Sequence, residues 1–351
     1  MKRKLKIAAI VVFCIGLLFT VAIVAMFFRP DLSREQLSEY VNEESKFIEL
    51  PSGANAHYRD EGNPEGPVVV LLHGGYGSLH NWDLWVDDLG TDYRVVRMDL
   101  PASGLTGRIP GDLYTRGPVV SFVHELLTAI DVEQFVLGGH SWGGGIALEY
   151  TLAHPDKVEG LILLGSEGVP PDEGYDAGGV FTSELDRSDT TAPEDVKISI
   201  TGRIFSKFSS PWVVGEILKA IMEKDDMITP EFARQFDRII RHDGNRHAMM
   251  LGFRQQVALL NDPKDLEPRL PEIEIPVLVQ IGRQDVLVPV EVGEKFHAGL
   301  PDSELKIYEN CGHMIQWEVE DESIQDVLLF LENRVWPPEE ASVEANTSNE
   351  N

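Results

Sequence analysis

The segment around Ser141 constrains the fold of this chain more than any other. A short apolar run, residues 135–138, precedes the pentapeptide GHSWG at 139–143, and a small, mostly apolar stretch follows up to residue 153. This order predicts a strand, a sharp turn and a helix, with the hydroxyl of Ser141 exposed at the turn. Glycines two positions before and after the serine allow the strand and the helix to pack closely.

Two later motifs supply partners for a reactive serine. The apolar run 275–282 predicts a strand, and the loop after it carries Asp285. A second short strand, 305–308, precedes the sequence NCGH that ends at His313. Catalytic groups gather at the carboxyl ends of strands in open α/β sheets. We therefore assign Ser141 as nucleophile, His313 as the base that takes its proton, and Asp285 as the acid that fixes the imidazole tautomer.

A glycine-rich loop upstream offers backbone donors for an oxyanion. The apolar run 67–72 is followed by HGGYG at 73–77. A tetrahedral intermediate is stabilised by about two preorganised N–H groups. We assign one of them to Trp142, directly after the serine, and the other to Gly75. Tyr76 is the alternative to Gly75 if the loop is offset by one residue.

These motifs resemble those of the α/β-hydrolase superfamily, in its serine-hydrolase branch, over roughly residues 46 to 335. The resemblance is carried by HGGYG, DLPASGLTG at 99–107, GHSWGG at 139–144, GRQDVLVP at 282–289 and NCGH. Many members have G-x-G-H before the base, whereas Asn310 replaces the first glycine here. Related dehalogenases and epoxide hydrolases have an aspartate as nucleophile, so Ser141 argues against both. The resemblance implies an α/β-hydrolase fold with a helical lid.

Several other polar residues compete for these roles. Asp99 ends a predicted strand, but it precedes the serine, which is the wrong order, so we expect it to organise its loop. His73 is expected to hold the glycine-rich loop by hydrogen bonds. His140 points away from the nucleophile in this interpretation and supports the turn. His297 falls in a helical stretch and is interpreted as a surface or packing residue.

The rest of the chain predicts one large α/β domain with an insertion. Alternating strands and helices call for a mostly parallel central sheet with helices on both faces. We expect the hydrolase core at 46–168 and 272–336 and a helical lid at 169–271 that covers Ser141. Apolar lid residues such as Met249 and Phe253 either line a substrate pocket or pack the lid helices together. A stalk at 29–45 and a disordered acidic tail at 337–351 complete the organisation.

The N-terminus predicts a membrane anchor. A basic flank at residues 1–6 precedes an uncharged run of 22 residues from 7 to 28. As a helix, such a run measures about 33 Å, enough for a bilayer core. We expect an uncleaved transmembrane helix with a cytoplasmic N-terminus, because basic flanks stay in the cytoplasm. The catalytic domain is then expected in the periplasm or another extracytoplasmic space.

Composition excludes several classes of partner. The formal net charge of −28 disfavours binding to nucleic acid. The two cysteines, Cys14 and Cys311, lie in the predicted anchor and near the active site, so no internal disulfide is expected. No metal-ligand spacing is present, and we predict no metal and no organic cofactor. The expected partners are a small-molecule substrate and, through the N-terminal helix, a membrane.

The function predicted from these residues is hydrolysis of a small or medium ester through an acyl-enzyme. The same triad serves a carbon–carbon bond hydrolase, a peptidase or a haloperoxidase-like enzyme, and these remain alternatives. A non-catalytic binding protein of the hydrolase fold is the alternative from another class.

Overall fold

A central sheet organises the chain in the computed structural model, which describes residues 2–171, 192, 195–259 and 266–338. Its eight strands follow the order β1-β2-β4-β3-β5-β6-β7-β8. All pairs from β4 to β8 are parallel, and β1 and β2 pair antiparallel at one edge. The strands are β1 (Ser45–Glu49), β2 (Asn55–Gly62), β3 (Val68–Leu72), β4 (Arg94–Met98), β5 (Phe135–His140), β6 (Val158–Leu164), β7 (Val277–Gly282) and β8 (Ser303–Tyr308).

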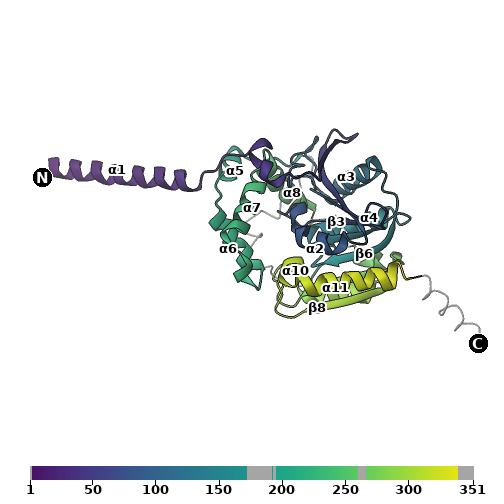
Figure 1. The fold of residues 1–351 in the computed structure, drawn as a ribbon. Helices are drawn as coiled ribbons and strands as arrows, with labels where there is room; N and C mark the ends of the chain where they lie inside the picture. The colour runs from purple at the N-terminus through teal and green to yellow at the C-terminus, as the bar shows by residue number, and fades with distance from the viewer. Residues whose placement is uncertain (1, 172–191, 193–194, 260–265, 339–351) are drawn as a thin grey trace, which may run out of the picture.

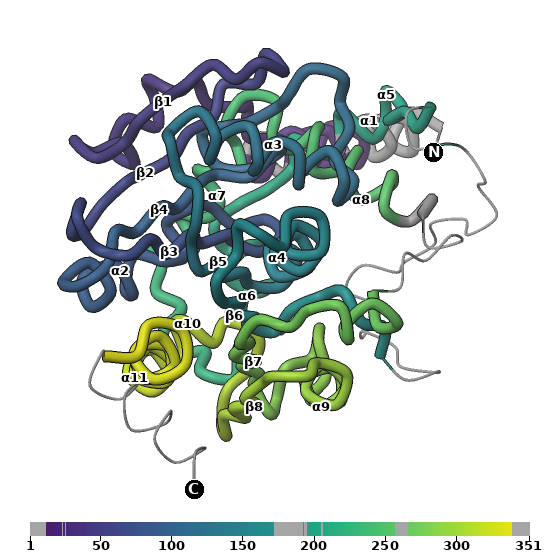
Figure 2. Tube along the Cα trace, turned by 90° about the vertical axis from the view of Figure 1, so that its right-hand side faces the viewer, coloured from purple at the N-terminus to yellow at the C-terminus, as the bar shows by residue number. Residues whose placement is uncertain are grey.

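Helices cover both faces of this sheet, as Figure 2 shows. On one face lie α3 (Arg116–Ala129), α4 (Trp142–Ala153) and α9 (Val290–Gly299), and on the other α2 (Asp83–Leu89) and α11 (Glu320–Phe330). Alternate residues of β3 divide between the two cores, with Val70 in one and Val69 in the other. Strands buried on both sides read as continuous apolar runs. The predicted mostly parallel sheet with helices on both faces is confirmed.

A helical insertion connects β6 to β7. It contains α5 (Ile200–Phe205), α6 (Pro211–Ile221), the short turn η4 (Asp225–Met227), α7 (Pro230–Ile240) and α8 (Asn245–Leu259). The side chains of Ser210 and Thr229 cap α6 and α7, and a proline occupies the first turn of each helix. Such caps explain why the helices start where they do. Parts of the predicted lid, 172–191, 193–194 and 260–265, lie outside the described residues, as does most of the predicted acidic tail.

Residues 29–45, expected to form a stalk, lie against this insertion. The N–H of Leu32 donates to the carbonyl of Arg241 at 2.7 Å. The carboxylate of Asp31 pairs with Arg246 at 2.5 Å and also with Lys207. The short helix η1 (Glu35–Tyr40) follows, and its Leu37 is fully buried. The segment is therefore part of the packed structure and not a free spacer.

The prediction of a membrane anchor is wrong. The uncharged run does form a helix, α1 (Lys2–Phe27), which extends away from the sheet in Figure 1. Within the residues that the structure describes, however, no helix combines the length and the apolar character that crossing a membrane requires. The sequence argument rested on the absence of charged residues from 7 to 28. This finding contradicts the predicted transmembrane span at 7–28, and with it the predicted membrane partner and extracytoplasmic location.

Candidate active site

Ser141 lies at the sharp turn between β5 and α4. Its backbone has φ 53° and ψ −120°, a conformation that residues with a side chain rarely adopt. The turn is held by the N–H of Ser141, which donates to the carbonyl of Leu164 at 2.9 Å. A Cβ on Gly139 would lie 2.4 Å from the carbonyl oxygen of Gly143, so only glycine fits there. This strained turn presents the serine hydroxyl at the carboxyl end of the sheet.

Asp285 and His313 meet at the same end of the sheet. Asp285 follows β7, and one of its oxygens, Oδ1, accepts the N–H groups of Leu287 at 2.8 Å and Val288 at 2.9 Å. The other oxygen, Oδ2, lies 2.7 Å from Nδ1 of His313. Both side chains are buried. The loop thus holds the carboxylate in the position from which it contacts the imidazole. Because Nδ1 of His313 faces Asp285, Nε2 is the ring nitrogen that can accept the serine proton.

The surroundings of His313 favour its charged form. Burial by itself lowers the pKa of this histidine, but the Asp285 carboxylate reverses that effect and raises the pKa above its usual value. Glu167 and Glu318 add to the rise. An imidazole stabilised as a cation is a stronger base toward a hydroxyl than a free one.

The expected oxyanion donors border the space in front of Ser141. Gly75, Tyr76, Trp142 and His313 all line the cavity that Ser141 lines. Trp142 is the first residue of α4, where N–H groups have no partner within the helix. Tyr76 has a φ of 60°, so the glycine-rich loop turns sharply at this point. The arrangement leaves Gly75 and Tyr76 as alternatives for the second donor.

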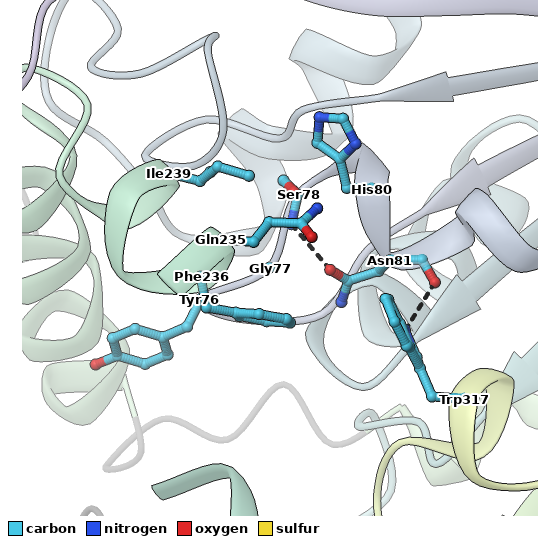
Figure 3. Close-up of a pocket in the computed structure, with 9 residues that line it drawn as sticks. All are labelled: Tyr76, Gly77, Ser78, His80, Asn81, Gln235, Phe236, Ile239 and Trp317. Carbon is cyan, nitrogen blue, oxygen red and sulfur yellow. Dashed lines mark hydrogen bonds between the residues drawn. The ribbon is translucent and has the colours of Figure 1, made fainter. Parts of the chain in front are cut away.

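Figure 3 shows how the glycine-rich loop is held in place. The loop from Tyr76 to Asn81 faces Gln235, Phe236 and Ile239 of α7 across a small cavity. The side chain of Asn81 accepts the N–H of Ser78, and its backbone carbonyl accepts Nε1–H of Trp317 at 3.1 Å. The helical insertion thus packs directly against the segment that carries the candidate oxyanion donors.

The buried polar residues set aside in the sequence have supporting positions. Nε2 of His73 accepts the N–H of Leu100 at 3.0 Å, so its Nδ1–H donates to the carbonyl of Gly74 at 2.7 Å. Asp99 lies 2.6 Å from Nδ1 of His57. Although burial opposes it, this histidine helps to hold the pKa of Asp99 well below its usual range. His140 lies against His313, and its Nε2 donates to the carbonyl oxygen of that residue at 2.8 Å.

The cavity in front of Ser141 has a volume of about 630 Å³ and is largely apolar. Drug-sized ligands occupy cavities of about 300–1,000 Å³. Met249 and Phe253 of α8 line it, together with Leu218 and Ile221 of α6. By contrast, Trp212 of α6 is 67% exposed. In the part of the chain that is described, no cluster of three or more His, Cys, Asp or Glu side chains is arranged to hold a metal ion.

Two acidic residues near His313 were missed by sequence reasoning. Glu167 follows β6 and lines the cavity. Desolvation by the surrounding protein raises the pKa of its carboxyl. Glu318 is buried directly after the histidine loop, at the end of α10 (Ile315–Glu318). A charged residue within the otherwise uncharged sequence HMIQWEV was the available signal for Glu318. Nothing in the sequence near Glu167 singles it out, because the chain fold alone brings it to the cavity.

This chain aligns with curated relatives over nearly their whole length. It is 30% identical over 304 residues to the 2-hydroxy-6-oxononadienedioate/2-hydroxy-6-oxononatrienedioate hydrolase of Paraburkholderia xenovorans (strain LB400), covering 82% of this chain and 95% of that protein. It is 28% identical to the 2-hydroxy-6-oxo-6-phenylhexa-2,4-dienoate hydrolase of Burkholderia cepacia, covering 86% and 99% respectively.

A solved structure shares the fold. The meta-cleavage product hydrolase of Pseudomonas fluorescens IP01 superposes with a TM-score of 0.66, is 23% identical, and matches 83% of this chain and 98% of that one. The family model of the alpha/beta hydrolase fold matches residues 67–319. That range includes the serine turn, the candidate acid and the candidate base. The chain therefore belongs to the α/β-hydrolase family.

Proposed function

We propose that this hydrolase breaks a carbon–carbon bond beside a ketone carbonyl, through an acyl-enzyme on Ser141. The observation that carries the proposal is the similarity to curated relatives over 82% of the chain or more. The substrates in the names of those relatives contain ketone and carboxylate groups but no ester or amide. Hydrolysis of such a molecule has to break a carbon–carbon bond. This assignment replaces ester hydrolysis, the main sequence prediction, as the preferred function.

In the first step, the hydroxyl oxygen of Ser141 attacks the ketone carbon. Nε2 of His313 takes the hydroxyl proton as the bond forms, because its other nitrogen is held by Asp285 at 2.7 Å. The Asp285 carboxylate stabilises the imidazolium without taking the proton itself. The negative charge develops on the former ketone oxygen, where the N–H groups of Trp142 and Gly75 are proposed to bind it. Each such donor is worth about 3 kcal/mol of transition-state stabilisation.

In the second step, the tetrahedral intermediate collapses and the carbon–carbon bond breaks. The departing carbon keeps the electron pair, and His313 returns its proton to that fragment. A carbon leaving group is viable only if its charge is delocalised, which a conjugated carbonyl in the fragment provides. The acyl group remains on Ser141 until water, activated by His313, hydrolyses it.

Ester hydrolysis remains a second candidate, because the same cavity suits a neutral acyl chain. Its described lining is mostly apolar, and the carboxylate beside Ser141 and His313 is Glu167. That carboxylate disfavours an anionic group close to the reacting carbonyl. A neutral ester, or a neutral ketone, avoids this repulsion.

A paired substrate assay tests the proposal. The purified enzyme is given 2-hydroxy-6-oxo-6-phenylhexa-2,4-dienoate, its neutral methyl ester, and p-nitrophenyl esters of increasing chain length. Carbon–carbon cleavage releases benzoate from the first two compounds, measured by chromatography. We expect benzoate from wild type and none from Ser141→Ala.

The outcomes separate the candidates. Cleavage of p-nitrophenyl esters with no release of benzoate makes the enzyme an esterase and overturns the carbon–carbon proposal. A wild-type protein that neither turns over any substrate nor reacts with a fluorophosphonate is a binding protein of the same fold.

A further inference from the structure

Four backbone N–H groups converge on the buried carboxylate of Glu318. Its Oε1 accepts from Gly312 at 3.1 Å and from Met314 at 3.1 Å. Its Oε2 accepts from Glu223 at 2.7 Å and from Lys224 at 3.0 Å. The side chain is 3% exposed, so the protein supplies the hydrogen bonds that water would otherwise make. We call this group of five residues the Glu318 clamp.

The two oxygens of the clamp bind different parts of the molecule. Gly312 and Met314 flank His313, so Oε1 holds the loop of the candidate base. Glu223 and Lys224 lie in the helical insertion, in the connection between α6 and η4. The clamp thus joins the histidine loop to the insertion through one side chain.

Further contacts at this junction show that it is closely fitted. The N–H of His313 donates to the carbonyl of Ile221, the last residue of α6, at 2.8 Å. A Cβ on Gly312 would lie 2.6 Å from that carbonyl oxygen and 2.8 Å from the nitrogen of Glu223. Next to the clamp, Trp317 packs edge-on against Phe232 of α7. The position of the candidate base is therefore tied to the insertion at several points.

Only a carboxylate fits this arrangement. It offers about four acceptor directions on two oxygens and carries no donor of its own. A glutamine of the same shape has one oxygen and one NH₂ group, and that NH₂ would face two N–H donors. A buried donor left without a partner is destabilising, so the loop or the insertion has to move.

We propose that Glu318 is a positioning residue that seats His313 against Ser141 by joining the histidine loop to the end of α6. The role rests on the proposed function of His313 and Ser141. It makes the reactivity of the serine depend on the insertion being docked, because the same carboxylate binds both. A displacement of about 1 Å at such a site costs up to a hundredfold in rate.

The clamp also acts on the charge of His313. The groups that face this histidine are Asp285, Glu167, Glu318 and His140, from four different segments. The acidic ones raise the pKa of His313. Removing the charge of Glu318 therefore lowers that pKa, and the base stays neutral, and active, to lower pH.

The test measures fluorophosphonate labelling of Ser141, which needs no knowledge of the substrate. We expect Glu318→Gln to label about ten- to a hundredfold more slowly than wild type. The midpoint of its acid limb should lie at lower pH. Glu322→Gln is the control, because Glu322 is an exposed carboxylate on the adjacent helix α11. It should label at the wild-type rate with an unchanged pH profile.

A second pair of variants keeps the test valid if Glu318→Gln does not fold. Glu223→Pro removes one N–H donor, whereas Glu223→Ala keeps it, and the side chain of Glu223 is exposed. Met222 is already extended, with φ −104° and ψ 141°, as a residue before proline should be. We expect the proline variant to label more slowly than the alanine variant, with both labelled at a temperature where circular dichroism shows them folded.

Equal labelling rates contradict the proposal. If Glu318→Gln matches wild type, or Glu223→Pro matches Glu223→Ala, the clamp does not position the base. A wild-type protein that fails to label overturns the proposed triad itself, and the role of Glu318 with it. If the wild-type protein labels normally but does not cleave the carbon–carbon substrate, the proposed substrate is wrong and the role of Glu318 is still judged by the labelling rates.

Discussion

Oδ2 of Asp285 lies 2.7 Å from Nδ1 of His313, while Oδ1 of the same carboxylate is held by the N–H groups of Leu287 and Val288. The two oxygens therefore have separate tasks: one fixes the side chain to its own loop, and the other faces the imidazole. This division allows the interaction with the histidine to be tested without disturbing the loop.

Asp285→Asn should reduce kcat without unfolding the protein. The amide oxygen can keep the bonds to Leu287 and Val288, and the NH₂ group then faces Nδ1 of His313. The histidine is forced into the wrong tautomer, for which we expect a loss of about a thousandfold or more in kcat. Steady-state kinetics together with thermal unfolding checks this. An Asp285→Asn enzyme with near wild-type kcat would exclude Asp285 as the acid.

Glu167→Gln should shift the pH profile of kcat/KM toward lower pH. A base works in its neutral form, so activity falls as pH drops through the pKa of His313. Burial lowers this pKa, while Asp285 and, to a smaller extent, Glu167 raise it. Without the charge of Glu167 the pKa falls, and the acid limb moves with it.

The same variant should favour anionic substrates. In the glutamine enzyme, kcat/KM for a keto acid should rise relative to kcat/KM for its neutral methyl ester. The ratio between the two compounds is the control, since a general loss of activity leaves it unchanged. An unchanged ratio and an unmoved acid limb would show that Glu167 does not act on the site.

Asp99→Asn should lower the stability of the folded protein, and not only its activity. The carboxylate lies beside His57 and accepts the N–H groups of Leu79 at 2.8 Å and Leu105 at 2.6 Å. Leaving buried donors of this kind without their acceptor costs about 1–3 kcal/mol. Urea unfolding followed by tryptophan fluorescence measures the loss. A midpoint equal to that of wild type contradicts the role of Asp99 in organising the loop.

The lowered pKa of Asp99 also indicates how the stability of the protein should depend on pH. Its pKa is lowered in the folded protein, so its contribution is present above the unfolded-state pKa of about 3.9. That contribution is lost as pH falls toward the folded-state pKa. The difference in unfolding free energy between wild type and Asp99→Asn should therefore shrink in acid.

Asp31→Ala should loosen the helical insertion. The carboxylate pairs with Lys207 of the insertion and with Arg246, whose side chain is largely buried. Removing it leaves a buried guanidinium without its counterion, at a cost of about 3 kcal/mol. We expect faster proteolysis within the insertion. Asp243→Ala, which removes an exposed carboxylate nearby, should be cleaved at the wild-type rate.

The sequence alone determined the elements of the fold and the candidate triad. Local patterns carry that information. Apolar runs predict buried strands, and GHSWG predicts the strained turn at Ser141. Asp285 and His313 each follow a predicted strand, in the order acid then base. The membrane anchor was also predicted from a local property, the absence of charge over residues 7–28, and that prediction was wrong.

Only the tertiary structure decided what surrounds the triad. Nothing in the sequence around Glu167 indicates that it lies near His313. Glu318 is close to His313 in the sequence, but its bonds to Glu223 and Lys224 of the insertion arise only from the fold. The stalk residues around Asp31 likewise look like a polar spacer until the fold places Arg246 beside them. Such contacts join residues far apart in the chain, and their energy depends on burial and distance, which exist only once the sheet and the insertion have packed.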